Sequence, residues 1–138
     1  MQVNFYEIGS IDDSLLDFAV IVSRHQNQWL LCKNQKRKTW ELPGGRRESG
    51  EAILETAKRE LFEETGATEF TVSPICVYSV KTDNESFGML FFAEITELGS
   101  LPESEIEEIG LFDDSPSDMS FPLIQPKLLN RVKEILHI

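Results

Sequence analysis

The pattern of apolar and polar positions predicts a chain built largely of β-strands. Short apolar runs bounded by polar residues, which are typical of strands, recur through the sequence. We expect strands at residues 3–8, 17–23, 29–32, 70–80, 87–95 and 106–112. Polar residues 25–28 suit a turn, so the second and third of these strands should form a hairpin. A polar loop around residues 83–85 joins the fourth strand to the fifth.

Residues 49–66 predict an amphipathic helix. Ile53, Ala57 and Leu61 recur at four-residue spacing and form one apolar face. Ser49 suits the N-cap, and Gly66 suits the left-handed residue that ends a helix. The helix therefore has one face for the core and another face for chemistry.

A second amphipathic helix is expected at residues 125–136. Its apolar residues are Leu128, Leu129, Val132, Ile135 and Leu136. Between the regular elements we expect a basic loop at 33–39, a break at 43–45 and an acidic turn region at 113–120. No repeat or linker divides the chain, so we expect one domain over residues 1–138.

The charge balance argues against two classes of partner. The chain has 24 acidic and 13 basic side chains and a net charge of −11. Duplex nucleic acid and anionic membranes are not expected to bind, because both require a basic surface. A small phosphate ester is compatible with an acidic protein, since bound metal ions reverse the local field.

Cysteine usage and apolar content indicate a cytoplasmic protein. Cys32 and Cys76 lack the spacing of a zinc site or a disulfide framework, so we expect two reduced, half-buried thiols. The longest apolar run near the N-terminus, residues 18–22, is too short for a signal peptide or a membrane span. The sequence leaves open whether the protein is a monomer or a homodimer.

Three glutamates of the first helix form the candidate active site. Glu60, Glu63 and Glu64 share one helical face, where like charges repel by roughly 0.2–0.5 kcal/mol per pair. A divalent cation relieves this repulsion, because hard cations such as Mg²⁺ prefer carboxylate oxygens. The alternative to a metal site is that these glutamates form only a solvated face, as is usual for a glutamate-rich helix.

The spacing of the residues around this cluster argues against that alternative. From Gly45 the chain reads G-x5-E-x7-R-E-L-x-E-E-x-G-A, which resembles the signature of the Nudix hydrolases. The matching residues are Gly45, Glu51, Arg59, Glu60, Leu61, Glu63, Glu64 and Gly66. Only Ala67 departs, being small where the family has a bulky aliphatic residue. Residues 40–44 (WELPG) also look like the segment that precedes the motif in this family.

The resemblance implies an α/β/α sandwich around a mixed sheet, and hydrolysis of a nucleoside diphosphate linked to a moiety X. It implies that Glu60, Glu63 and Glu64 bind Mg²⁺ or Mn²⁺ together with the backbone carbonyl of Gly44. Arg59 would orient a glutamate, most simply Glu60. Glu51 would support the loop and the outer shell of the metal. The general base is left open between Glu60 and a later residue, Glu105, Glu107 or Glu108.

Substrate contacts are expected on both sides of the motif. The basic residues that could bind phosphates are Lys33, Arg37, Lys38 and Arg46, although loop residues of this kind are as often simply solvated. Phe121, Phe87 or Tyr78 could stack on a base, with core packing as the alternative. The segment from Phe121 to Gln125 resembles one that, in MutT-type members, brings a side-chain amide to an oxidised guanine. Gln125 would take that role, unless it only begins the last helix.

The resemblance leaves several substrates open. A proline typical of ADP-ribose hydrolases is missing, since Asp83 stands at its position, and a tyrosine typical of dinucleoside polyphosphate hydrolases is also absent. These absences favour a nucleoside triphosphate, including an oxidised one of the 8-oxo-dGTP type, as the substrate. ADP-ribose, a nucleotide sugar or an RNA 5′ end is the alternative. A module that binds nucleotides without cleaving them is disfavoured, because such modules usually lose motif carboxylates.

Overall fold

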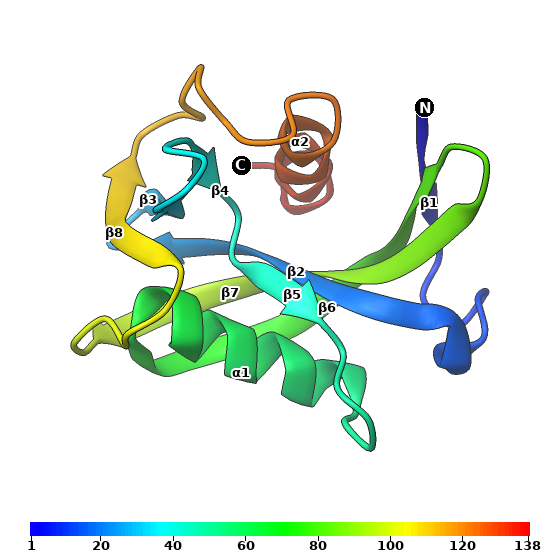
Figure 1. The fold of residues 1–138 in the computed structure, drawn as a ribbon, viewed down its shortest axis with the longest axis horizontal. Coiled ribbons are helices and arrows are strands. Elements are labelled where there is room, and N and C mark those ends of the chain that lie inside the picture. The colour runs from blue at the N-terminus through cyan, green and yellow to red at the C-terminus, as the bar shows by residue number, and fades with distance from the viewer.

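A computed structural model describes residues 1–138 and contains one mixed sheet with helices on both faces (Figure 1). The strands are β1 (Gln2–Tyr6), β2 (Leu16–His25), β3 (Gln28–Asn34), β4 (Trp40–Glu41), β5 (Gly44–Arg46), β6 (Ala67–Lys81), β7 (Glu85–Leu98) and β8 (Ile106–Phe112). The helices are α1 (Ile53–Thr65), α2 (Gln125–Leu136) and a short 3-10 turn, η1 (Asp13–Leu15).

The sheet has the strand order β1-β6-β7-β2-β3-β4, with β5 paired to β2 and β8 paired to β3. β2 and β7 run parallel, and the other pairs are antiparallel, so the sheet is mixed. Helix α1 covers one face and α2 covers the other (Figure 1). The expected α/β/α sandwich is therefore confirmed.

Two apolar cores result, one under each helix, because side chains alternate between the two faces of a strand. Ala57 and Leu61 of α1 pack in the first core with Ile21 of β2. Leu128 and Leu129 of α2 pack in the second core with, among others, Val22, the next residue of β2. Consecutive apolar residues in β2 therefore face opposite helices, which explains why this strand reads as a continuous apolar run.

Helix α1 begins later than the sequence pattern predicted. Its N-cap is Ala52, whose backbone N–H donates to the Glu55 carboxylate at 2.9 Å. The prediction of Ser49 as the N-cap is wrong, because Gly50 adopts a left-handed conformation with φ of 81° and keeps the preceding residues in a loop. The predicted end is confirmed, since Gly66 is left-handed with φ of 79°.

The other elements agree with the prediction in kind and differ in extent. Strands β6 and β7 are longer than expected at both ends, while α2 has the expected bounds. Residues 44–46 form strand β5 rather than a break. Cys32 and Cys76 are free and buried, rather than half-buried. None of the helices has the length and apolar character that crossing a membrane requires.

Truncation of Leu61 should destabilise the fold, because this side chain is fully buried between α1 and the sheet. We expect Leu61→Ala to lower the free energy of unfolding by about 2–5 kcal/mol through lost burial and the cavity left behind. Leu54→Ala is the matched control, since Leu54 lies on the same helix and is 38% exposed. Chemical denaturation that gave equal losses for the two variants would contradict this packing.

Candidate active site

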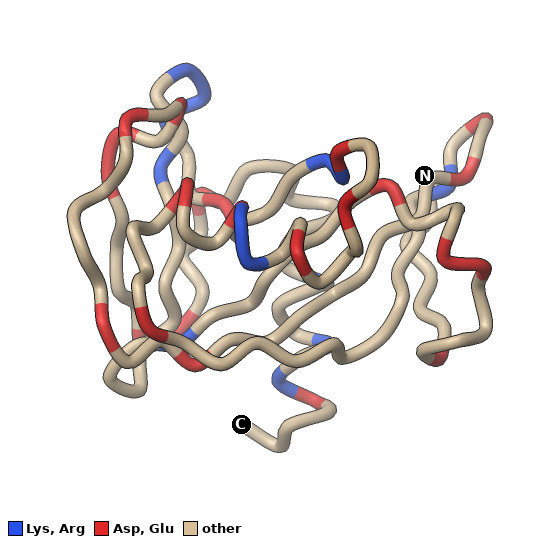
Figure 2. Tube along the Cα trace, turned by 90° about the horizontal axis from the view of Figure 1, so that it is seen from below, with Lys and Arg blue, Asp and Glu red and all other residues tan.

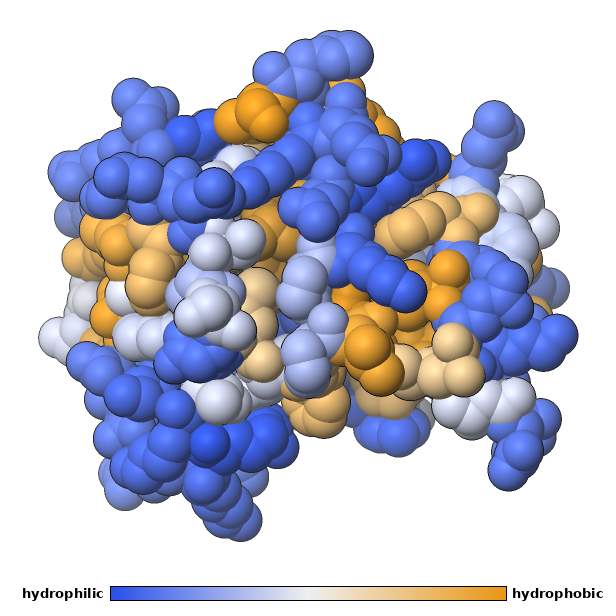
Figure 3. Space-filling view, turned by 90° about the horizontal axis from the view of Figure 1, so that it is seen from above, coloured by the Kyte–Doolittle hydropathy of each residue, from blue (hydrophilic) through white to orange (hydrophobic).

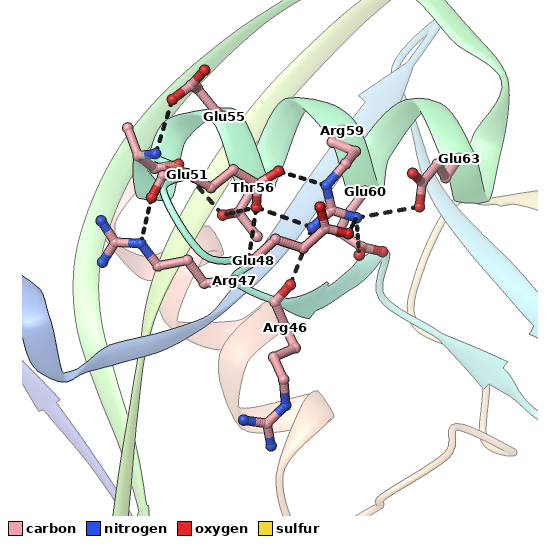
Figure 4. A network of polar contacts seen from close by, with 10 residues as sticks. Arg46, Arg47, Glu48, Glu51, Glu55, Thr56, Arg59, Glu60 and Glu63 are labelled. Atoms are coloured by element: carbon pink, nitrogen blue, oxygen red, sulfur yellow. Dashed lines mark hydrogen bonds and ion pairs between the residues drawn. The ribbon is translucent and has the colours of Figure 1, made fainter.

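Arg59 is the centre of the polar network on α1 (Figure 4). Its guanidinium donates to both carboxylate oxygens of Glu51, from Nε at 2.6 Å and from Nη2 at 3.1 Å. Its Nη1 donates to Glu60 at 2.7 Å and to Glu63 at 3.3 Å. The Arg46 carbonyl accepts from Nη2 at 3.1 Å. One side chain of the helix thus binds the preceding strand, the loop and two motif glutamates.

Glu51 holds the loop between β5 and α1 in place. Its carboxylate accepts from the backbone N–H of Glu48 at 3.0 Å and from the hydroxyl of the buried Thr56 at 2.7 Å. The hydrogen bond from Arg59, with those from Glu48 and Thr56, lowers the pKa of Glu51 to about 2. The side chain is therefore ionised near neutral pH and fixed in one position.

The glycine pair of β5 brings backbone and carboxylates into contact. A Cβ at Gly45 would lie 2.5 Å from the carboxylate of Glu60, and a Cβ at Gly44 would lie 2.5 Å from the Ala19 carbonyl oxygen. The backbone N–H of Gly44 donates to Glu64 at 2.7 Å. Only glycine at these two positions leaves room for Glu60 beside Gly45 and for the Ala19 carbonyl beside Gly44.

Burial distinguishes the carboxylates of the cluster. Burial raises the pKa of Glu64 to about 8, and the negative charges of Glu60 and Glu41 act in the same direction. Burial also raises the pKa of Glu60, although the hydrogen bond from Arg59 opposes the shift. Glu63 is more exposed, with 46% of its side chain open to solvent.

These carboxylates fit a hard divalent cation by their chemistry. They supply anionic oxygens, and a cation among them would offset both the desolvation of Glu64 and the repulsion between neighbours. The structure does not gather three of the carboxylates around one point. Glu60 and Glu63 face Arg59, and Glu64 faces the N–H of Gly44. Metal binding would therefore require these side chains to turn, and the part expected of the Gly44 carbonyl stays a prediction.

Glu41 is a member of this site that the sequence did not single out. It is only 8% exposed and accepts two hydrogen bonds from Arg37, at 2.6 and 3.1 Å. The hydroxyl of Ser120 donates to the same carboxylate at 2.7 Å. Its negative charge contributes to the raised pKa of Glu64. A buried glutamate in a two-residue strand gives no periodic signal, and the resemblance of residues 40–44 to the segment before the motif was the one sequence signal that included it.

The buried Cys32 thiol lies beside the same acidic group. Its Sγ donates to the Glu41 carbonyl at 3.4 Å. Burial, with the charges of Glu64 and Glu41, raises the pKa of this thiol well above its usual value.

An apolar cavity of about 380 Å³ opens on the α2 side of β5. It is lined by Phe18, Val20, Tyr78, Val80, Ser86, Phe121, Ile124, Gln125 and Leu128. Val20 and Phe18 of β2 pair in register with Gly44 and Arg46 of β5. Strand β5 therefore separates the carboxylates from the cavity. Apolar patches between hydrophilic residues are visible on the α2 side of the molecule in Figure 3.

Phe121 is held at this cavity in an unusual backbone conformation. Its φ is 50°, a left-handed value that is uncommon for a residue with a side chain. Its carbonyl accepts hydrogen bonds from the N–H groups of Ile124 and Gln125, at 2.9 and 3.0 Å. The guanidinium of Arg37 lies over the ring, 5.0 Å from its centroid.

The structure brings some of the predicted base-binding residues together and separates another. Phe121, Tyr78 and Gln125 line the cavity. Phe87 lies on the opposite face of the sheet, where it packs against the α1 core and the ring of Tyr6. Phe87 pairs with Ser79, one residue away from Tyr78, and neighbours in a strand face opposite sides.

The basic residues expected to bind phosphates differ in their surroundings. Lys33 forms an ion pair with Glu108 at 3.6 Å, and Lys38 forms one with Glu107 at 3.0 Å. Arg46 forms no ion pair; its guanidinium lies 4.8 Å from the ring centroid of Phe18, at the cavity. In Figure 4 its side chain points away from the carboxylate network.

The later glutamates lie beside the basic loop. Glu107 and Glu108 are in β8, paired with the two lysines. Glu105 precedes β8, and its carbonyl accepts from the N–H of Gln35 at 2.8 Å. The structure places none of the three in hydrogen-bond contact with Glu60, Glu63 or Glu64, so a role as general base stays a prediction. Figure 2 shows how acidic positions are distributed over the α1 side of the molecule.

Comparison with known proteins agrees with this geometry. The NUDIX domain family model matches residues 14–121. Over 117 residues the chain is 42% identical to a Bacillus subtilis (strain 168) protein provisionally named an 8-oxo-dGTP diphosphatase, covering 84% of this chain and 74% of that protein. Over 57 residues it is 39% identical to the Mus musculus protein nucleoside diphosphate-linked moiety X motif 6, covering 41% of this chain and 18% of that protein.

A solved structure shares the fold over nearly the whole chain. The Bacillus subtilis pyrophosphohydrolase BsRppH, crystallised as a mutant, superposes with a TM-score of 0.79 and 26% sequence identity. The match covers 96% of this chain and 89% of that chain.

The raised pKa of Glu64 should make the metal-free protein less stable as the pH rises. Near pH 4.5 and below, the carboxyl is protonated in the folded and unfolded states; from about 4.5 to about 8 only the unfolded chain gains from ionisation. We expect a loss of up to about 5 kcal/mol across this range, measured by thermal unfolding in EDTA.

Glu64→Gln should remove this part of the pH dependence, because the amide does not ionise. Glu69→Gln, at an exposed position of β6, should retain it. If the wild-type protein and Glu64→Gln had the same pH profile, Glu64 would not be the group responsible.

Proposed function

The chain belongs to the NUDIX domain family, and we propose that it is a metal-dependent pyrophosphohydrolase that converts a nucleoside triphosphate to the monophosphate and pyrophosphate. One observation carries this proposal. Strand β5 is bordered by the Glu60 and Glu64 carboxylates on one side and by a cavity of about 380 Å³ on the other. A nucleotide is amphipathic in the same way, with an anionic phosphate chain and a flat base.

The carboxylates would act on the phosphate end. Glu60, Glu63 and Glu64 would hold Mg²⁺ or Mn²⁺, which when bound offsets phosphate charge and lowers the pKa of a coordinated water. Arg59 positions Glu60 and Glu63, and Glu51 fixes Arg59. Water would form a bond to one phosphorus of the anhydride between the α- and β-phosphates, and the bond from that phosphorus to the bridging oxygen would break. The other product would leave with the bridging oxygen, and the water proton would pass to a carboxylate.

The cavity would bind the base end. The Phe121 ring is exposed, and hydrogen bonds to its carbonyl fix the backbone that carries it, so the ring would be placed at the cavity to stack on a base. Arg46 lies between the acidic cluster and the cavity. Its carbonyl accepts a hydrogen bond from Arg59, and its guanidinium lies over the ring of Phe18. Because it has no carboxylate partner, this cation is available to a phosphate of the bound nucleotide.

The relatives support the same class of reaction. A Bacillus subtilis relative carries a provisional 8-oxo-dGTP diphosphatase name, and the structural neighbour from the same organism is named a pyrophosphohydrolase. We therefore include oxidised deoxynucleoside triphosphates among the candidate substrates. A small nucleotide, rather than duplex nucleic acid or a membrane, suits a protein with a net charge of −11.

Removing one motif carboxylate should abolish most of the activity. With Mg²⁺ and a panel of (d)NTPs that includes 8-oxo-dGTP, the wild-type protein should release pyrophosphate. Glu63→Gln should lower turnover roughly 100- to 10,000-fold, since the amide supplies no negative charge to a metal or a proton. Glu69→Gln, remote from the site, should remain active. Near-normal turnover of folded Glu63→Gln would refute the proposal.

Arg46→Ala should weaken substrate binding rather than chemistry. Loss of a charge-assisted contact to phosphate should raise KM about 10- to 100-fold and change kcat little. Lys58→Ala is the matched control, because Lys58 is an exposed cation of α1 without an ion pair. Steady-state kinetics showing the same KM for both variants would exclude Arg46 from substrate binding.

A further inference from the structure

All three guanidinium nitrogens of Arg47 bind acceptors of the chain. Nε donates to the Glu51 carbonyl at 2.7 Å. Nη1 donates to the carbonyls of Asp13 and Leu16, at 2.9 and 3.3 Å, and Nη2 donates to the Asp13 carboxylate at 2.9 Å. Position 47 is one of those that the motif leaves unspecified. Unlike an uncommitted cation, this arginine is therefore used to join parts of the protein.

The contacts of Arg47 tie the loop between β5 and α1 to the start of β2. Some of the acceptors belong to η1 and to the first residue of β2, whereas the Glu51 carbonyl lies at the far end of the loop. The backbone N–H of Arg47 adds a hydrogen bond to the Asp17 carbonyl at 2.7 Å. Among residues 47–52, only Arg47 has a side chain that hydrogen-bonds to a segment outside the loop and α1. One side chain thus anchors the loop from outside the motif.

Two arginines hold Glu51, one by its backbone and the other by its side chain. Arg47 binds the carbonyl of Glu51, while Arg59 binds both oxygens of its carboxylate. In Figure 4 the guanidinium of Arg47 points away from Arg59, toward the other side of the loop. The position of Arg59 is therefore connected to Arg47 through a single residue.

This connection matters most when a cation occupies the motif. A metal ion would turn Glu60 and Glu63 away from Arg59, whose Nη1 would lose both hydrogen bonds. The other hydrogen bonds of Arg59 go to the Glu51 carboxylate and the Arg46 carbonyl, at the two ends of the loop. The guanidinium would then stay in place only as far as the loop itself is held.

We propose that Arg47 is a positioning residue of the active site, which anchors the loop of residues 47–52 to η1 and β2. By holding Glu51 it keeps Arg59 in place while the motif carboxylates bind a metal ion. Arg47 itself touches neither substrate nor metal in this role. The assignment rests on the proposed function, because it assumes that the reaction uses the metal-bound arrangement.

Arg47→Ala should slow the reaction without weakening nucleotide binding. A misplacement of about 1 Å can cost about 100-fold in rate, so we expect kcat for the triphosphate that the wild-type protein cleaves fastest to fall about 10- to 100-fold. KM should change little, because neither Arg47 nor any of its partners lines the apolar cavity. Arg131→Ala is the matched control, since it removes a part-buried arginine of α2 that forms an ion pair with Glu134. Wild-type kcat in folded Arg47→Ala, or an equal loss in the control, would overturn the inference.

Two further variants separate positioning from a loss of folding. Arg47→Lys keeps the charge beside Asp13, but an ammonium cannot bind several separated carbonyls as the guanidinium fork does. This variant should fold and still lose kcat. Adding Arg47→Ala to Glu51→Ala should cost far less than it costs in the wild-type protein, because both changes break the same route to Arg59. Wild-type kcat in Arg47→Lys, or losses that multiply in the double variant, would overturn the inference.

Proton exchange in the metal-free protein tests the anchoring without hydrolysis. NMR should show a protected Nε–H of Arg59 in the wild-type protein, since this group donates to the Glu51 carboxylate at 2.6 Å. In Arg47→Ala its exchange with water should be at least about tenfold faster, because the loop opens more often, and in Arg131→Ala it should be unchanged.

The exchange and kinetic measurements can fail separately. If the wild-type protein hydrolysed no triphosphate, the proposed function would fail, and faster exchange in Arg47→Ala would still support the anchoring of Glu51 and Arg59. Unchanged exchange in Arg47→Ala and Arg47→Lys would overturn the inference even if nucleotides were hydrolysed.

Discussion

The arrangement of the site depends on the guanidinium of Arg59. Three of its nitrogens bind Glu51, Glu60 and the Arg46 carbonyl, and so connect the loop, the helix and β5. A planar fork with five donors can satisfy several acceptors at fixed angles, whereas an ammonium cannot. The same contacts keep acidic groups close together that would otherwise repel one another. In this structure the guanidinium therefore fixes where Glu51, Glu60 and Glu63 lie, and a metal ion would have to turn Glu60 and Glu63 away from it.

Strand β5 turns this cluster into one half of a two-sided site. Because Gly44 and Gly45 carry no side chains, the backbone lies directly against Glu60 and pairs closely with β2. The cavity on the α2 side begins at the paired residues of β2. Charge and apolar surface thus lie on opposite sides of one short strand, as the proposed binding of a nucleotide requires.

Local patterns in the sequence account for much of this structure. The motif spacing brings Glu60 and Glu63 to Arg59 because residues within two turns of a helix have fixed relative positions, whereas Glu64, expected beside them, faces the N–H of Gly44. The two ends of α1 show how far such local patterns predict helix boundaries. Gly66 signals the C-terminus of the helix. The loop before Ala52 is held by the side chains of Glu51 and Arg59, and no capping pattern describes these contacts.

Contacts between distant segments could not be predicted in this way. The hydrogen bond between Leu42 and Gln125 joins residues 83 positions apart, and the one from Ser120 to the buried Glu41 joins residues 79 positions apart. Strand pairing also decides which face an aromatic residue takes, so Tyr78 lines the cavity while Phe87 lies on the other side. Apolar character alone does not distinguish the two faces of a sheet that is buried on both sides.

The environment of Cys32 has a consequence for the chemical durability of the protein. Only the thiolate form of cysteine reacts readily with peroxides and alkylating reagents. Burial, with acidic neighbours, raises the pKa of this thiol and keeps the sulfur protonated, and burial also raises the pKa of Cys76, the other cysteine. Both thiols are therefore poor targets for oxidants. The burial and the negative charges that surround the proposed active site therefore also protect the cysteine beside it from oxidation.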